Sequence, residues 1–200
     1  MWSKSMRLAG LVLAAAALAG CATSFVVDSN VQSFSSLAAL PAQPTYRFDR
    51  LPSQQAFQFQ GQIEAMADPA LFKAGLRRDD AAPQLGVQVT ARVQRVLSPW
   101  AWADPWDEWG GLPGWHPWHG AFGPFPRAEQ PWYHREVGIV VRELPTGRVV
   151  YETHAVSDGP WSDNAAVFPA MFDAALQGFP SAPAGVRQVN VTVGPPAAAR

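Results

Sequence analysis

Two histidines near the middle of the chain lie among carboxylates, and together they could bind a divalent metal ion. His116 and His119 are three residues apart, and further candidate ligands are close in the sequence: Asp104, Asp107, Glu108 and His134. Imidazole nitrogens and carboxylate oxygens are ligands that Zn²⁺ and Cu²⁺ accept. Pro117 separates the two histidines, however, so no helix face presents them together. We interpret them as exposed side chains of an aromatic loop, and we expect no metal and no cofactor.

A second candidate is the triplet Ser162-Asp163-Asn164, which resembles the Ser-Asp-Asn motif of penicillin-interacting enzymes. That chemistry also needs a nucleophilic serine three residues before a lysine. Lys73 is the only lysine after residue 20, and position 70 holds an alanine. We therefore interpret Ser162 or Asp163 as the N-cap of a helix, because both side chains accept hydrogen bonds from backbone N–H groups. We expect no catalytic residues in this chain.

The only cysteine, Cys21, ends a short apolar run. Lys4 and Arg7 precede twelve residues that are apolar apart from one glycine, which is the layout of a secretory signal. Twelve residues are too few to span a bilayer, which takes ~20. Leu18-Ala19-Gly20-Cys21 resembles the lipobox of bacterial lipoproteins. This resemblance implies cleavage before Cys21, diacylation of its thiol and acylation of the new amino terminus. An uncleaved signal anchor, or a cleaved signal that leaves a free thiol, stays the alternative.

The residue after the cysteine suggests which membrane would hold the anchor. Ala22, rather than aspartate, stands there. In lipoproteins of the enterobacterial type this implies an outer-membrane anchor with the domain facing the periplasm. We expect residues 1–20 to be a signal peptide and 21–44 to hold the lipidated N-terminus, a first strand and an irregular connection. A single domain over 45–193 and a disordered tail over 194–200 would complete the chain.

The charge of the expected mature chain excludes one class of partner. Removing Lys4 and Arg7 with the signal leaves 13 basic and 16 acidic side chains among 180 residues. A mildly acidic chain without a basic stripe has no electrostatic means of binding phosphate backbones, so we expect no nucleic-acid partner. Acylation of Cys21 would also leave no intrachain disulfide, and the hydrophobic core must then stabilise the fold.

The spacing of apolar side chains predicts the elements that would position these residues. Alternation of apolar and polar residues predicts a strand over 85–94, a hairpin that turns at 145–147 and a closing strand over 188–193. Short β-prone stretches at 26–27 and 46–48 predict two earlier strands, joined by an irregular connection over 33–44. Helical spacing predicts one helix from Ser53 to Gly75 and a second from Asp163 to Gly178. We expect Pro69 to interrupt the first helix, and Pro169 to confine the regular part of the second helix to the residues after it.

These elements predict an α+β fold in which two amphipathic helices pack on an antiparallel or mixed β-sheet. A long Trp/Pro/Gly-rich insertion over 99–132 lies between two of the strands and keeps neither periodicity. Indole rings stack on sugars, sit at membrane interfaces and anchor protein contacts. The tryptophans of this insertion are therefore the candidate binding surface: Trp100, Trp102, Trp106, Trp109, Trp115, Trp118 and Trp132. The alternative is that several rings cover the sheet.

Short motifs along most of residues 24–193 resemble a family of bacterial lipoproteins, domain of unknown function 4136. They are Thr45-Tyr46-Arg47-Phe48, the segments 70–76 and 83–87, Thr146 to Tyr151, and Gly178-Phe179-Pro180. Gln84 and Tyr151 depart from the family's aspartate and tryptophan. The resemblance implies a periplasm-facing lipoprotein with a compact fold of helices and sheet and no assigned activity, and it supplies no catalytic residues.

We therefore expect a non-enzymatic, lipid-anchored cell-envelope protein that binds or assembles. Its expected partners are the membrane, through acyl chains on Cys21, and another envelope protein or a glycan. An envelope hydrolase, or a metal-binding protein that uses residues near the tryptophan-rich insertion, is the alternative.

Overall fold

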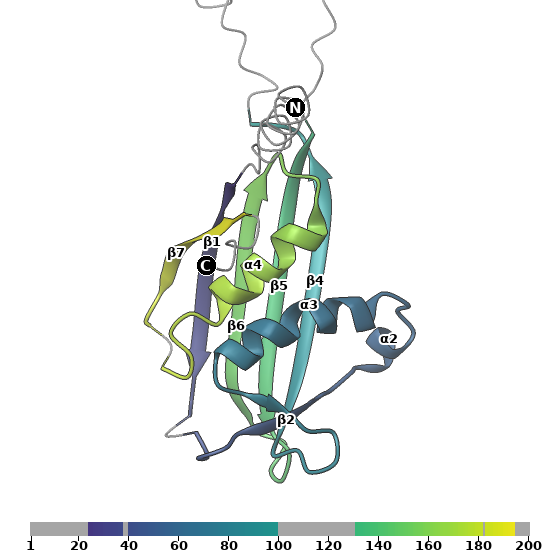
Figure 1. Ribbon diagram of the computed structural model, residues 1–200, viewed down its shortest axis with the longest axis vertical. Coiled ribbons are helices and arrows are strands. Elements are labelled where there is room, and N and C mark those ends of the chain that lie inside the picture. Colours follow the sequence, from purple (N-terminus) through teal and green to yellow (C-terminus); the bar gives the residue numbers. More distant parts are fainter. Residues whose placement is uncertain (1–23, 38–39, 100–130, 182, 195–200) are drawn as a thin grey trace, which may run out of the picture.

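A computed structural model describes residues 24–37, 40–99, 131–181 and 183–194. Seven strands form one mixed sheet in the order β3-β2-β4-β5-β6-β1-β7 (Figure 1). Neighbouring strands from β4 to β7 in this order are antiparallel, and β2 is parallel to β3 and β4. The strands are β1 (Phe25–Ser35), β2 (Thr45–Phe48), β3 (Arg77–Arg78), β4 (Leu85–Val96), β5 (Trp132–Glu143), β6 (Val149–Gly159) and β7 (Val186–Val193).

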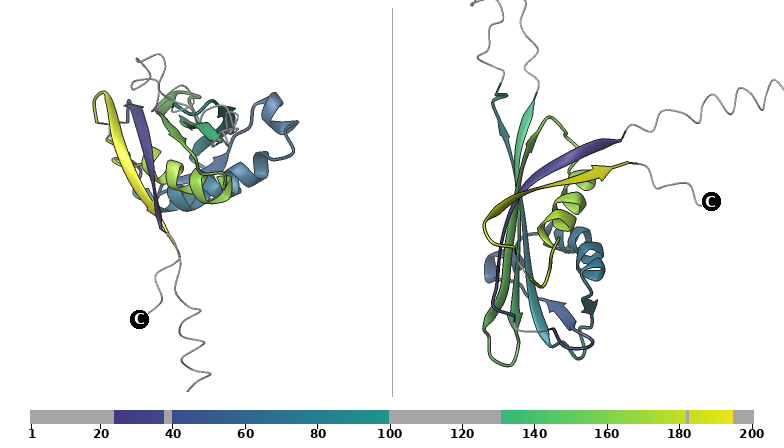
Figure 2. Two further views of the ribbon diagram at one scale, coloured as in Figure 1. Left: turned by 90° about the horizontal axis from the view of Figure 1, so that it is seen from above. Right: turned by 90° about the vertical axis from the view of Figure 1, so that its left-hand side faces the viewer.

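Helices cover one face of this sheet and leave the other face open (Figure 2). The helices of the described residues are α2 (Pro52–Gln55), α3 (Gln60–Lys73) and α4 (Asn164–Ala175). Helix α4 contacts β1, β5, β6 and β7, whereas α3 contacts β4 and α4. The sequence-based expectation of an α+β fold with a mixed sheet is thus confirmed. Helices α3 and α4 provide this cover, whereas α2 is a single turn that lies off the edge of the sheet and buries no residue (Figure 1).

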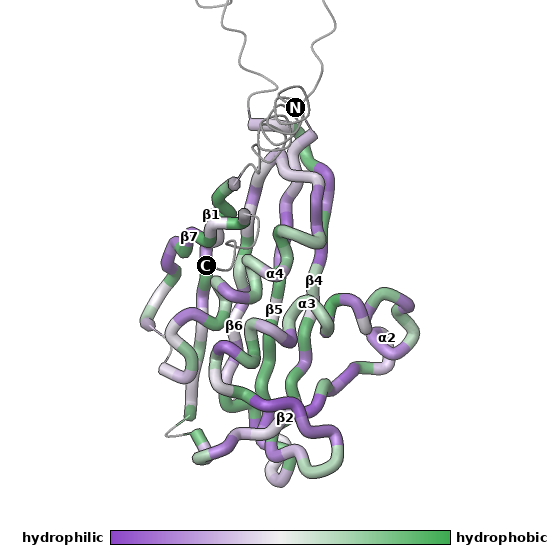
Figure 3. The backbone as a smooth tube through the Cα atoms, in the orientation of Figure 1, coloured by the Kyte–Doolittle hydropathy of each residue, from purple (hydrophilic) through white to green (hydrophobic). Residues whose placement is uncertain are grey.

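The core lies between the sheet and these two helices. Every second residue of β4 points toward the helices, and Val87 and Val89 are fully buried opposite Val141 and Ile139 of β5. Apolar residues accordingly gather along β4, β5 and β6 where the helices cross them (Figure 3). On the open face the alternate positions are mostly polar and partly exposed, as in a sheet that is solvated on one side.

Both helices differ from the expectation at their prolines. Helix α3 continues through Pro69 and α4 continues through Pro169, so neither residue interrupts or confines its helix. Each helix buries side chains on both sides of its proline, for example Ala67 and Leu71 in α3. This packing offsets the lost hydrogen bond and the ring clash, which cost ~3 kcal/mol.

Two further boundaries differ from the expectation. The helix predicted from Ser53 to Gly75 is divided in two: Leu51 is the N-cap of α2, which starts at Pro52, and α3 starts only after Phe59. Strand β1 extends to Ser35, so the irregular connection begins later than predicted. Buried Ser33 belongs to this strand and makes a 2.7 Å hydrogen bond to the hydroxyl of Thr153 on β6.

Five strand ends lie together at one end of the domain: the start of β1, the end of β4, the start of β5 and the ends of β6 and β7. The register shows this, because Phe25 pairs with Val193, Val96 pairs with Trp132, and Tyr133 pairs with Gly159. We call it the upper end, after its place in Figure 1. The twist of the sheet swings β1 and β7 toward the helix side there (Figure 2). Among the described residues, no helix has the length and apolar character needed to cross a membrane.

Candidate functional site

An apolar groove of about 590 Å³ lies between α3, α4 and the upper part of β4. Its main lining side chains are Phe57, Phe59, Ile63, Met66, Val93 and Phe168. Phe57 and Phe59 are each 47% exposed and contact each other edge to face at 5.7 Å. Among the residues that the structure describes, none that lines the groove is charged. The volume lies in the range of ligand-binding clefts, and the lining fits an apolar or aromatic partner group.

A partly buried polar network holds the wall of the groove that carries these two phenylalanines. The Glu64 carboxylate accepts two hydrogen bonds from Arg50, at 2.6 and 2.5 Å, and hydrogen bonding to this partner raises the pKa of Arg50. Gln54 and Gln60 both donate to the carbonyl of Val89 on β4, at 2.8 and 3.1 Å. The segment from α2 to the start of α3 is therefore fixed to the sheet edge, which keeps the groove open beside it.

The opposite wall is the start of α4, which is fixed to β5. Asp163 caps this helix, because its carboxylate accepts from the backbone N–H groups of Ala165 and Ala166. Arg135 is 1% exposed and donates to the Asn164 side chain at 2.9 Å and to the carbonyl of Trp161. Burial lowers the pKa of this guanidinium. Its hydrogen bonds fix the residues before α4 against the sheet.

The tryptophan-rich segment leaves and rejoins the domain beside the groove. Val93 lines the groove, and Val96, three residues later, pairs with Trp132. Trp132 is a half-buried residue of β5, so the segment ends one residue earlier than predicted. The other six tryptophans of the predicted surface lie outside the described residues: Trp100, Trp102, Trp106, Trp109, Trp115 and Trp118. Cys21 also lies outside them.

A polar hollow of about 250 Å³ lies on the open face of the sheet, around Gly138. Thr90 and His154 pair with this glycine from the two neighbouring strands, and Glu136 and Glu152 also line the hollow. A Cβ atom at position 138 would come within 2.8 Å of the Thr90 hydroxyl. The missing side chain therefore creates the hollow. His154 is half-buried in it.

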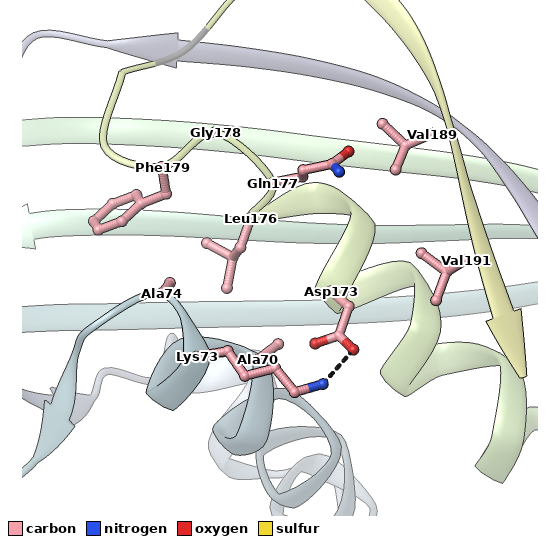
Figure 4. A pocket seen from close by; sticks show the side chains of 10 residues that line it. All are labelled: Ala70, Lys73, Ala74, Asp173, Leu176, Gln177, Gly178, Phe179, Val189 and Val191. Atoms are coloured by element: carbon pink, nitrogen blue, oxygen red, sulfur yellow. Dashed lines mark hydrogen bonds and ion pairs between the residues drawn. The ribbon is translucent and has the colours of Figure 1, made fainter. Parts of the chain in front are cut away.

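A third hollow, of about 390 Å³, lies between the C-terminal ends of α3 and α4 and strand β7 (Figure 4). Lys73 and Asp173 form an ion pair at 2.6 Å across its mouth. Val189 and Val191 line its β7 side, and Phe179 lies at the other end. Both partners of the ion pair are partly exposed, so it contributes little to stability.

The structure places Lys73 far from the Ser162-Asp163-Asn164 triplet. Lys73 bonds to Asp173, which lies nine residues after Asn164 and therefore about 14 Å further along α4. Asn164 is engaged by Arg135 and Asp163 caps the helix, so the triplet has a structural role. His134 contacts Asp158 at 2.8 Å, and the described residues contain no group of three potential metal ligands. The remaining metal candidates lie outside the described residues: Asp104, Asp107, Glu108, His116 and His119.

The apolar periodicity of the sequence does not indicate this groove, because helical spacing places Phe59, Ile63 and Met66 on one buried helix face. The chain instead turns before α3, so Phe59 stands at the helix start and remains half-exposed. The only available signal was the pair Phe57 and Phe59, which are separated by one residue and cannot share a helix face.

The architecture defines the class of protein as an α+β domain with helices on one face of a mixed sheet. The model of the family described as "Domain of unknown function (DUF4136)" matches residues 30–181. The chain belongs to this family, as its motifs predicted. A search of curated proteins found no match.

A search of solved structures found matches at low identity. A PDZ domain protein from Parabacteroides distasonis is 16% identical, with a TM-score of 0.48; the match covers 86% of this chain but only 39% of that protein. The PelC dodecamer from Paraburkholderia phytofirmans is 11% identical, with a TM-score of 0.44, covering 74% of this chain and 94% of that one. A minor lipoprotein from Acinetobacter baumannii is 10% identical, with a TM-score of 0.30 over 66% of this chain and 84% of that one.

Proposed function

We propose that this chain is a lipid-anchored cell-envelope protein whose domain is a non-catalytic binding or assembly module. Acyl chains on Cys21 would anchor it in the outer membrane, with the domain in the periplasm. The lipobox-like residues Leu18 to Cys21 support the anchor. Three acyl chains bury far more methylene groups than the single chain that gives only marginal membrane binding. The partner would be another envelope protein or a glycan.

The observation that carries the binding role is the position of the apolar groove. The tryptophan-rich segment begins and ends within a few residues of Val93, which lines the groove. Exposed aromatic side chains in a water-accessible groove are typical of binding surfaces, since they supply large contact areas. The groove wall with exposed Phe57 and Phe59 would supply the aromatic contact area for such a partner.

Tryptophan fluorescence of the full chain, purified with its lipid anchor and reconstituted in vesicles, tests this role. We would add peptidoglycan fragments and a cell-envelope extract in separate titrations, and measure emission wavelength and acrylamide quenching. Binding through the aromatic surface predicts a shift to shorter wavelength and reduced quenching in one of the titrations. Emission that is already protected in the free protein, and unchanged by every addition, would contradict the proposal.

Two matched variants connect the signal with the groove. Phe59→Ser removes an exposed aromatic ring that lines the groove, whereas Phe72→Ser removes one that does not, although Phe72 is also exposed on α3. We expect the first variant to weaken the response by roughly tenfold, as for a contact near the centre of an interface. The second variant should retain it. Equal responses of both variants would exclude the groove from the contact.

A further inference from the structure

A small apolar surface lies at the upper end of the domain, where the start of β1 contacts the loop before α4. The ring of Phe25 lies 4.4 Å from the ring of Trp161, which belongs to the loop before α4. Trp161 is 42% exposed, and the neighbouring Val26 is 45% exposed. We call Phe25 and Trp161 the anchor face, because Phe25 is only four residues after Cys21 in the sequence and Trp161 contacts it, whereas Val26 points to the other face of the sheet.

Trp161 is held firmly in this exposed position. The buried guanidinium of Arg135 donates to its carbonyl oxygen and to the side chain of Asn164, on the other side of the loop. The indole packs against the backbone at Gly159, where a Cβ atom would lie 3.4 Å from the ring, an ordinary contact distance. A rigid, half-exposed tryptophan loses little side-chain entropy when a partner covers it.

The length of chain between Cys21 and the anchor face limits how far the domain can stand from a membrane. Cys21 is four residues before Phe25. A fully extended chain spans at most 3.3–3.6 Å per residue, so the start of β1 lies within about 14 Å of the acylated residue. The other end of the domain, with the β5–β6 turn at Thr146, is separated from it by the length of the strands (Figure 1).

We propose that the anchor face contacts the lipid bilayer, so that the domain stands on the membrane with its upper end down. This inference rests on the proposed acylation of Cys21. Indole rings prefer the interface between acyl chains and headgroups, where the apolar ring is covered and the N–H group stays hydrated. The tryptophan-rich segment leaves from the upper end too, and it would start close to the bilayer.

The charges around the anchor face define the kind of lipid surface. Asp28, Asp158 and Asp163 are exposed near this end, and Asp158 contacts His134. Arg92 and Arg95 near the end of β4 are exposed as well, so the charges at this end are mixed and do not favour an anionic surface. The contact should therefore form on zwitterionic phosphatidylcholine vesicles, and it should depend little on salt because apolar burial drives it.

The single cysteine makes a direct test possible. Once Cys21 is acylated, a cysteine introduced elsewhere is the only free thiol and can carry a fluorescent label. We would label Ser162→Cys beside Trp161, with Pro145→Cys in the distant β5–β6 turn as the control. The full chains would be reconstituted in phosphatidylcholine vesicles that contain lipids with a nitroxide quencher in the upper acyl chain. Mass spectrometry would first establish that Cys21 is acylated.

We expect at least threefold stronger quenching at position 162 than at 145, at low and at high salt. Adding Trp161→Ala to the Ser162→Cys chain should reduce the quenching at 162 toward that at 145, whereas Phe72→Ala should not change it. Equal quenching at both positions in an acylated protein would overturn the inference and leave the proposed function intact. A mass without acyl groups would overturn both.

Discussion

Thr153→Val should destabilise the domain strongly, because the Thr153 hydroxyl joins three elements. On β6 it lies 2.7 Å from the Ser33 hydroxyl of β1, and it lies 2.9 Å from the carbonyl of Ala175 at the end of α4. All of these groups are buried. Valine has nearly the same shape, so the substitution removes hydrogen bonds without leaving a large cavity.

The magnitude depends on the groups that lose their partner. Thr153→Val leaves the Ser33 hydroxyl and the Ala175 carbonyl short of a partner, and a buried unsatisfied polar group costs about 1–3 kcal/mol. We expect a loss of about 2–3 kcal/mol in the free energy of unfolding. Ser33→Ala should cost only about 1 kcal/mol, because Thr153 keeps its bond to Ala175. The double variant should then be less destabilised than the sum of the two single variants.

Urea unfolding monitored by circular dichroism measures these values, and thermal unfolding should show a shift of about 2–4 °C for each kcal/mol in a domain of this size. Thr192→Val is the matched control, because Thr192 is exposed on the edge strand β7. Its effect should stay within about 0.5 kcal/mol. If Thr153→Val behaves like Thr192→Val, the buried hydroxyl does not connect α4 to the sheet.

Three further substitutions test other parts of the structure. Glu64→Ala should cost about 1–3 kcal/mol in urea unfolding, because it removes the two charge-assisted bonds from Arg50; an unchanged midpoint would contradict the network that supports the groove. Gly138→Ala should cost about 1–3 kcal/mol, because its Cβ meets the Thr90 hydroxyl on a packed sheet, and a neutral result would mean that the hollow adapts freely. Hydrogen bonding to Thr146 and to a neighbouring arginine lowers the pKa of Glu143 in the folded protein. The ionised carboxylate therefore stabilises the fold at pH values above its unfolded pKa, and this stabilisation is lost as the pH falls through the lower folded pKa. Glu143→Gln should therefore lose less stability than the wild type between about pH 5 and pH 2 in unfolding curves, and parallel curves would exclude this contribution.

The sheet was predictable because its signal is local. The apolar residues of β4 alternate over ten positions, and the Pro145-Thr146-Gly147 turn defines the β5–β6 hairpin; Gly147 indeed has a φ of +69°. Such patterns reflect the geometry of a strand with one buried face. The order of the strands and the parallel position of β2 depend on contacts between distant residues, and no short pattern encodes them.

The helices and the groove show where local signals fail. Proline disfavours a helix interior, but Pro69 and Pro169 are accepted because the surrounding residues pack against the sheet. The groove depends on the break between α2 and α3, which the glutamine contacts to the Val89 carbonyl hold in place. Periodicity cannot reveal a groove that a partly buried polar network supports.

The mass of the mature protein is the most direct test of the proposed lipid anchor on Cys21. The full chain, expressed with its own leader and extracted from membranes, should lack residues 1–20 and carry acyl groups on Cys21. The Cys21→Ser chain should retain its leader and carry no acyl group. A wild-type mass equal to that of the uncleaved chain, or a cleaved chain with a free thiol at Cys21, would contradict the account.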